Sequence, residues 1–104
     1  MTFRILVADD QSESLIALAA LLQRPGFSVE VVQSGSDALR RLLQEGPFDL
    51  SLLDLHMPGL TGLEVLARMR SDPVKGDLPI LILSGSEDLP SKVGGLDAGA
   101  DDYL

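Results

Sequence analysis

Apolar and polar positions follow two different periods along the chain. Four short runs are rich in Val, Ile, Leu and Phe, as strands are. They are Phe3–Ala8, Val29–Val31, Phe48–Leu53 and Ile80–Leu83. Between these runs, apolar residues recur every three or four positions, which is typical of the buried face of a helix. The three helical stripes lie within Leu15–Leu22, Ala38–Leu43 and Leu63–Arg70.

Glycine and proline mark where these elements end. Pro25-Gly26 and Gly46-Pro47 are expected to stop the first and second helices. Residues 88–98 predict a weaker fourth helix, because Pro90 and two glycines lower its helix propensity. Tyr103-Leu104 is expected to begin a fifth strand.

The order of the elements predicts the class of fold. A strand followed by a helix occurs four times, and the first residues of another strand follow. Strict alternation with short connections predicts a parallel sheet with helices on both faces, which is the doubly wound α/β class. With 104 residues, no repeat and no linker, the chain is expected to form one domain over residues 1–104.

Composition and charge narrow the class of protein. Hydrophobic residues make up 45% of the chain and only four residues are aromatic, which predicts an aliphatic core. Eight basic and sixteen acidic residues give a net charge of −8, which disfavours binding of nucleic acid by this segment. The chain has no cysteine and no apolar run long enough to cross a bilayer. We therefore expect a cytoplasmic protein that does not bind membranes.

Polar residues stand where three of the predicted strands end. Asp9 and Asp10 follow the first strand, Asp54 follows the third and Ser84 follows the fourth. The carboxyl ends of parallel strands form one edge of a sheet, where ligands of such folds bind, so these side chains are expected to converge. Because neighbours in a strand point to opposite faces, Asp9 and Asp10 can face one ion only where the strand becomes a loop.

Three carboxylates at one place repel one another unless a cation neutralises them. An all-oxygen donor set with room for water suits Mg²⁺. Each residue alone has a simpler interpretation, since Asp10 with Glu13 three positions later fits the start of a helix. Asp54 alone would open the following turn, and Ser84 alone would bond to the backbone. The joint pattern favours the metal site, because independent caps have no reason to share one edge.

The sequence lacks the motifs of several other chemistries. There is no GxxxxGK phosphate loop, no GxGxxG after a strand and no GxSxG elbow. His56 is the only histidine, which excludes a metal site built from several histidines. Phosphoryl transfer assisted by Mg²⁺, with a carboxylate as the nucleophile, remains.

Four segments resemble the receiver domain of bacterial two-component response regulators. They are ILVADD at 5–10, DLSLLDLHMPGLTGLE at 49–64, LPILILSGSED at 78–88 and AGADDYL at 98–104. The segments have the order and spacing of that family across the chain. The resemblance implies a flavodoxin-like strand order of 2-1-3-4-5 and a signalling switch that is controlled by phosphorylation.

The resemblance also implies roles for the acidic residues. Asp54 would be the phosphoacceptor and would receive a phosphoryl group from a sensor histidine kinase or a phosphotransfer protein. Asp9 and Asp10 would hold Mg²⁺ together with Asp54. The backbone carbonyl of His56 would be a further ligand of the ion.

Two more residues would read out the phosphorylated state. Ser84 would bond to a phosphoryl oxygen, and Tyr103 would change rotamer as Ser84 moves. Met57-Pro58-Gly59 matches the turn that follows the phosphoacceptor in the family. Pro58 presets φ in this turn, and Gly59 is free to take a positive φ.

The chain departs from the family near its C-terminus. Receiver domains have a lysine at the end of the fifth strand, whereas the lysines here are Lys75, before the fourth strand, and Lys92, in the weak helix. The fifth strand and the last helix would be truncated at Leu104, so we expect a fragment, with any output domain beyond that residue. An uncovered sheet face and an exposed edge at Ile80–Leu83 predict dimers, segment exchange or marginal stability.

Two other functions stay open at this point. An interaction module that works without phosphorylation is favoured by the missing lysine and disfavoured by the intact acidic set. An Mg²⁺-dependent aspartyl phosphatase commonly has a second Asp two residues after its nucleophile, where this chain has His56. We therefore expect no enzymatic activity beyond phosphorylation and dephosphorylation of Asp54 itself.

Overall fold

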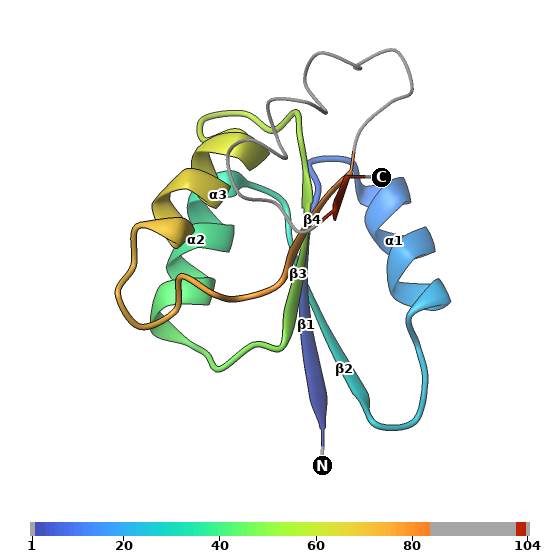
Figure 1. The fold of residues 1–104 in the computed structure, drawn as a ribbon. Helices are drawn as coiled ribbons and strands as arrows, with labels where there is room; N and C mark the ends of the chain where they lie inside the picture. The colour runs from blue at the N-terminus through green and yellow to red at the C-terminus, as the bar shows by residue number, and fades with distance from the viewer. Residues whose placement is uncertain (1, 84–101, 104) are drawn as a thin grey trace.

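The chain forms a parallel sheet between two layers of helices, in a computed structural model that describes residues 2–83 and the backbone of 102–103 (Figure 1). The strands are β1 (Phe3–Ala8), β2 (Phe27–Val32), β3 (Leu50–Asp54), β4 (Ile80–Leu83) and β5 (Asp102–Tyr103). The helices are α1 (Ser12–Leu21), α2 (Gly35–Gln44) and α3 (Gly62–Arg70). The order of the strands is β2-β1-β3-β4-β5, which confirms the predicted topology.

The strands β1 and β4 have the bounds that the apolar pattern predicted, but β3 begins later than expected. The backbone N–H of Asp49 donates to the carbonyl of Arg4 at 2.8 Å, and the strand proper starts after it. Phe48 lies before the strand and is buried, with the Arg4 guanidinium 4.3 Å from the centre of its ring. Its apolar character therefore reflects burial beneath Arg4 and not membership of the strand.

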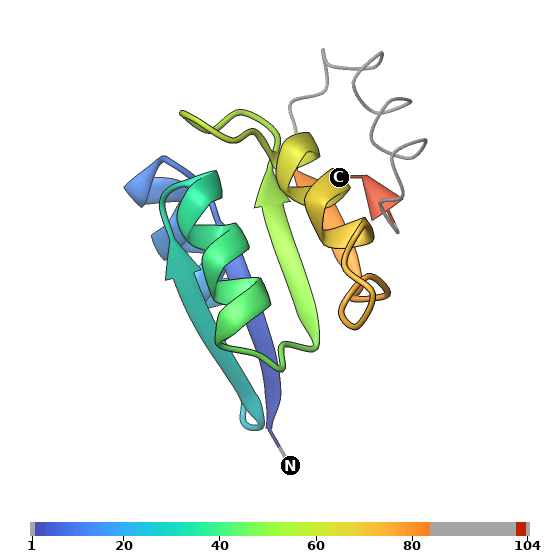
Figure 2. The same cartoon turned by 90° about the vertical axis from the view of Figure 1, so that its left-hand side faces the viewer.

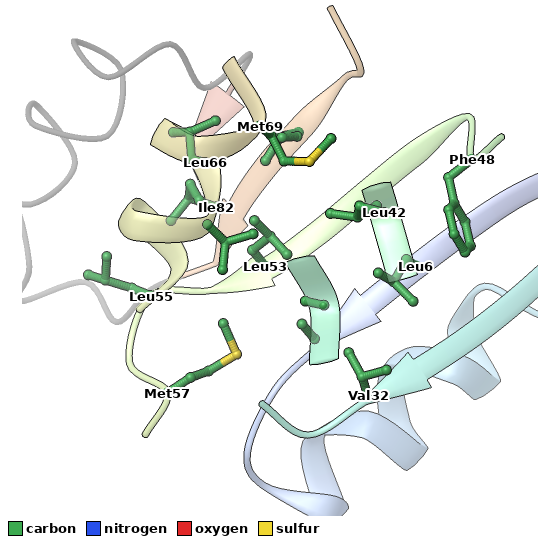
Figure 3. Packing of buried hydrophobic residues seen from close by; sticks show 14 residues of the cluster. Leu6, Val32, Leu42, Phe48, Leu53, Leu55, Met57, Leu66, Met69 and Ile82 are labelled. Atoms are coloured by element: carbon green, nitrogen blue, oxygen red, sulfur yellow. The ribbon is translucent and has the colours of Figure 1, made fainter. Parts of the chain in front are cut away.

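The helices cover the two faces of the sheet unequally. The helix α1 lies on one face, and α2 and α3 lie on the other (Figures 1 and 2). The larger core fills the space beneath α2 and α3, where Leu6, Leu53 and Ile82 are fully buried (Figure 3). The smaller core lies beneath α1 and contains Ile5, Val7, Leu15 and Leu52.

Polar side chains fix where α2 and α3 begin. The Ser34 hydroxyl accepts a hydrogen bond from the backbone N–H of Asp37 at the start of α2. At the start of α3, Thr61 and Glu64 form a reciprocal capping box. A helix end with such a cap gains about 1 kcal/mol over one without it. The start of α3, which follows the end of β3, is therefore held firmly.

Lys75 lies in the loop before β4, as the sequence predicted, and it is bonded far from the carboxyl ends of the strands. Its Nζ donates to the carbonyl oxygens of Leu42 and Leu43 at 3.1 and 2.6 Å. These carbonyls belong to the last turn of α2, where positive charge is favourable. Lys75 therefore secures the C-terminal end of α2.

The prediction that β4 forms a bare edge is wrong for the described residues. The backbone of β5 pairs with β4 in parallel, with Leu81 opposite Asp102 and Ile82 opposite Tyr103. The predicted helix at 88–98 lies outside the described residues. Over residues 2–83, the helices do not combine the length and apolar character that a membrane span requires.

Candidate functional site

Two adjacent strands bring three carboxylates together at the carboxyl edge of the sheet. Ala8, at the end of β1, is paired with Leu53 of β3, so the chain leaves both strands at the same level. Asp9 and Asp10 follow β1, and Asp54 is the last residue of β3. One carboxylate oxygen from each of the three lies within 4.8 Å of the others.

The two neighbouring aspartates have different surroundings. Asp9 is buried, and its Oδ1 accepts a hydrogen bond from the backbone N–H of Gln11 at 3.0 Å. Asp10 is exposed. The residue that precedes the first turn of α1 is Gln11, whose side chain makes no capping bond. The interpretation of Asp10 as a helix cap is therefore wrong, because α1 begins at Ser12 with Gln11 in the N-cap position, one residue later than a cap at Asp10 requires.

Burial and like charges make Asp54 a weaker acid than usual. Its pKa is raised from 3.8 to about 6, mainly by burial and then by the negative charges of Asp9 and Asp10. A hydrogen bond from the backbone N–H of His56 and the charge of His56 act in the opposite direction on the same pKa. Asp54 is therefore largely ionised at neutral pH, although its ionised form is destabilised by its surroundings.

The donor set fits a small divalent cation. Carboxylate oxygens are hard ligands, and a cation among them would relieve the repulsion that, after burial, raises the pKa of Asp54. Mg²⁺ is usually held by one or two carboxylates together with water and phosphate oxygens. Asp9, Asp10 and Asp54 are the residues that would hold it.

The loop after Asp54 has the predicted turn. Met57 is buried and Gly59 has a φ of 75°, a conformation that suits glycine. His56 is exposed beside the site. Ser84 lies outside the described residues, and only the backbone of Tyr103 is described, opposite Ile82.

Sequence reasoning missed the contribution of Gly62. This first residue of α3 packs so closely on the end of β3 that a Cβ there would overlap the carbonyl oxygen of Asp54. The backbone N–H of Gly62 also donates to the carbonyl of Leu55 at 3.1 Å. The pattern T-x-x-E at residues 61–64 is a capping-box signature and predicts this helix start, but the close approach to Asp54 is tertiary.

Comparison with protein families gives one match over nearly the whole chain. The family described as response regulator receiver domain matches residues 5–104. Among curated proteins, response regulator MprA of Mycolicibacterium vanbaalenii is 45% identical over 104 residues, and that of Mycobacterium tuberculosis is 43% identical. Each alignment covers all of this chain and 44% of the relative, so the chain spans less than half the length of these proteins.

Solved structures share the whole fold. A putative response regulator from Chloroflexus aurantiacus has a TM-score of 0.93 at 33% identity, over 100% of this chain and 84% of that chain. The receiver domain of Francisella response regulator 1452 has a TM-score of 0.87 at 29% identity, over 99% of this chain and 83% of that chain. The likeness extends over the sheet edge that carries the three carboxylates.

The contact between Gly62 and Asp54 predicts the effect of a single methyl group. Gly62→Ala forces α3 away from the end of β3, and we expect it to lower the free energy of unfolding by about 1–3 kcal/mol. Ala67→Ser adds one atom to an exposed position of the same helix and should change stability by less than about 0.5 kcal/mol. Urea unfolding measures both values, and equal losses in the two variants would contradict the packing argument.

The raised pKa of Asp54 predicts a pH-dependent stability without divalent cations. The folded protein holds the proton of Asp54 more tightly than the unfolded chain does, so stability falls as pH rises from about 4 to about 6. Asp54→Asn removes this penalty, which is about 1 kcal/mol at pH 7 after allowance for screening by solvent. The variant should therefore be more stable than the wild type at pH 7 and equally stable near pH 4.

Asp37→Asn is the matched control for this experiment, because Asp37 is exposed on α2. Its stability relative to the wild type should not follow the same pH dependence. A difference between Asp54→Asn and the wild type that is the same at pH 4 and pH 7 would show that ionisation of Asp54 costs the fold nothing.

Proposed function

The chain belongs to the response regulator receiver domain family, and from this premise we propose that it is a signalling switch phosphorylated on Asp54. The observation that carries the proposal is the group of three carboxylates whose oxygens lie within 4.8 Å of one another. Burial, and then the charges of Asp9 and Asp10, raise the pKa of Asp54. Asp54 is largely ionised at neutral pH, as a nucleophile must be.

Transfer to Asp54 requires one bond to form and one to break. A carboxylate oxygen of Asp54 attacks the phosphorus of a phosphohistidine, forming an O–P bond while the P–N bond breaks and its electron pair returns to the imidazole. The donor is proposed to be a sensor histidine kinase or a phosphotransfer protein. The product is an acyl phosphate on Asp54, which has lost the carboxylate charge and gained a phosphoryl group.

The remaining residues of the site position these groups. Asp9, Asp10 and Asp54, with the backbone carbonyl of His56, are proposed to hold Mg²⁺, which when bound supplies positive charge that offsets that of the carboxylates and the phosphoryl group. Asp9 is fixed by burial and by the N–H of Gln11. The backbone N–H of His56 orients the carboxylate of Asp54.

The output of the switch is proposed to depend on two positions that follow β4 along the chain. Ser84 is proposed to bond to a phosphoryl oxygen, and Tyr103 to change rotamer in response. The MprA relatives are more than twice as long as the part that matches. An output domain in the remaining part of such a protein is therefore part of the proposal.

Phosphorylation of Asp54 can be tested by intact mass spectrometry after exposure to acetyl phosphate with Mg²⁺. We expect one added phosphoryl group in the wild type and none in Asp54→Asn. Asp37→Asn makes the same substitution at an exposed position and should be labelled like the wild type. The added mass should disappear with hydroxylamine, which cleaves acyl phosphates and leaves phosphoesters. Equal labelling of Asp54→Asn and the wild type would refute the assignment.

Binding of Mg²⁺ can be tested separately by thermal unfolding. A cation that binds only the folded state at ten times its Kd adds about 1.4 kcal/mol, which corresponds to a rise in Tm of several degrees. Asp10→Asn should reduce this rise and should itself stabilise the protein in the absence of the ion.

Glu13→Gln is the matched control, since it removes one negative charge from the first turn of α1 and leaves the three carboxylates intact. Its response to Mg²⁺ should equal that of the wild type. If millimolar Mg²⁺ raises the Tm of Asp10→Asn as much as that of the wild type, the carboxylates are not the site.

A further inference from the structure

The strand β2 lies at one edge of the sheet and leaves half of its backbone groups facing outward (Figure 2). The carbonyls of Gly26 and Val32 accept hydrogen bonds from Phe3 and Asp9, at 2.7 and 3.2 Å. The even-numbered residues of this segment therefore face β1. Since peptide groups alternate along a strand, the N–H and C=O groups of Val29 and Val31, and the C=O of Phe27, face away from the sheet.

This edge lacks the features that usually protect an edge strand from pairing. Its sequence, FSVEVV, contains no proline and no lysine, and its pairing with β1 is continuous over six residues. Its one charged side chain, Glu30, is neutralised within the molecule. Glu30 Oε2 accepts from Arg4 at 3.1 and 2.6 Å, and Glu30 Oε1 pairs with Arg41.

Exposed apolar side chains accompany the open backbone on the α1 side of the sheet. Phe27 and Val31 are 42% and 44% exposed. Ile16, on the neighbouring helix α1, is 71% exposed. A groove of about 470 Å³ lies at the end of β2 between α1 and α2, and it is lined by Leu15, Ile16 and Val31 as well as by Asp37, Arg40 and Arg41 of α2.

We propose that β2 pairs with β2 of a second copy of this chain, antiparallel, around a two-fold axis at Val29. A two-fold axis that makes neighbouring strands antiparallel is perpendicular to the sheet, so the α1 face of one copy continues into the α1 face of the other. Centred at Val29, the pairing places Phe27 opposite Val31 and Val29 opposite Val29. The apolar side chains then form one continuous stripe across both strands.

The placement of side chains favours this register over its neighbour. Centred at Val29, the pairing places Glu30 opposite Ser28 on the α2 side of the sheet. A pairing centred at Glu30 would place the two Glu30 side chains, each with its Arg4 and Arg41 partners, directly opposite each other. It would also leave Phe27 beyond the end of the paired segment.

The outward backbone groups match the same register. The N–H of each Val29 meets the C=O of the other Val29, and the N–H of each Val31 meets the C=O of Phe27. The N–H of Phe27 is already bonded to the carbonyl of Arg24 at 3.0 Å and needs no partner. Four hydrogen bonds therefore join the copies without breaking one inside either copy.

The helices agree with this arrangement. The helix α1 packs against both β1 and β2. Neighbouring strands are about 4.8 Å apart, so the two α1 axes would lie about 10 Å apart across the axis, the spacing of packed helices. The pairing would therefore cover Ile16 as well as Phe27 and Val31.

The association is expected to be weak and to strengthen with salt. One strand and one helix face from each copy form an interface at or below the lower limit for stable complexes, about 1,200 Å² in total. Each copy carries a net charge of −8, and this long-range repulsion is screened as salt is added. The proposal does not depend on phosphorylation of Asp54.

Analytical ultracentrifugation of the 104-residue chain, from about 10 μM to about 1 mM, tests the association. We expect a monomer–dimer equilibrium that shifts toward dimer at high salt. Val31→Lys, which places a charge on the edge, should weaken the association at least about tenfold. Val74→Lys makes the same change at a residue that is 86% exposed in the loop before β4 and should leave the association unchanged.

Cysteine cross-linking tests the register, because the 104 residues contain no cysteine. In the Val29→Cys dimer, the introduced cysteines of the two copies face each other with Cα atoms about 5.5 Å apart, within reach of a disulfide. In Val31→Cys they are four residues apart along the strands, about 13 Å, which is too far. We expect oxidation to give covalent dimers of Val29→Cys and not of Val31→Cys or Val74→Cys.

Three results would overturn the proposal. A chain that stays monomeric up to about 1 mM at high salt does not pair through β2. Equal association of Val31→Lys and Val74→Lys would place the contact elsewhere on the surface. Preferential cross-linking of Val31→Cys would show that the strands meet in a different register.

Discussion

Repulsion among Asp9, Asp10 and Asp54 is the constraint on which the site depends. The sheet maintains this repulsion because it holds the three carboxylates close together. The carboxylates sit at the ends of β1 and β3, which pair directly and lie inside the sheet. Leu6 and Leu53, which belong to these two strands, are fully buried, so the strands cannot separate to relieve the charges without opening the core. This repulsion adds to burial, the larger cause, in raising the pKa of Asp54. In a fold whose central strands packed less tightly, the three carboxylates would move apart and the repulsion among them would fall.

The position of Asp54 is also determined by contact of its backbone with the first residue of α3. Gly62 places the start of that helix against the carbonyl of Asp54, and the capping box of Thr61 and Glu64 fixes where the helix begins. The start of α3 is therefore in direct backbone contact with the end of β3. Close packing of backbone on backbone, which only glycine permits, thus couples the stability of a helix to the geometry of the site.

The sequence predicted much of this arrangement because parallel strand ends must meet at one edge. The alternation of strands and helices determined the class of fold, and polar residues after the apolar runs identified where Asp54 would lie. The exceptions arise where a residue depends on a distant or competing partner. The apolar pattern assigns Phe48 to a strand, but its side chain is buried beneath Arg4, which belongs to β1 and is distant in the sequence. Asp10 has the spacing of a cap, but α1 begins at Ser12 with Gln11 in the N-cap position. The spacing of apolar and polar residues along the chain predicts neither of these two features.

The carboxylates on this sheet have two opposite kinds of surroundings. Glu30 on β2 is matched by the guanidinium groups of Arg4 and Arg41, which removes its charge from the edge and adds ion pairs between β1, β2 and α2. The ion pairs of Arg4, Arg40 and Arg41 are made with Glu30, Asp37 and Glu45. An arginine beside Asp9, Asp10 and Asp54 would lower the pKa of Asp54 and occupy the space of a cation. The placement of the arginines therefore decides which acidic residues stabilise the fold and which remain open to a ligand.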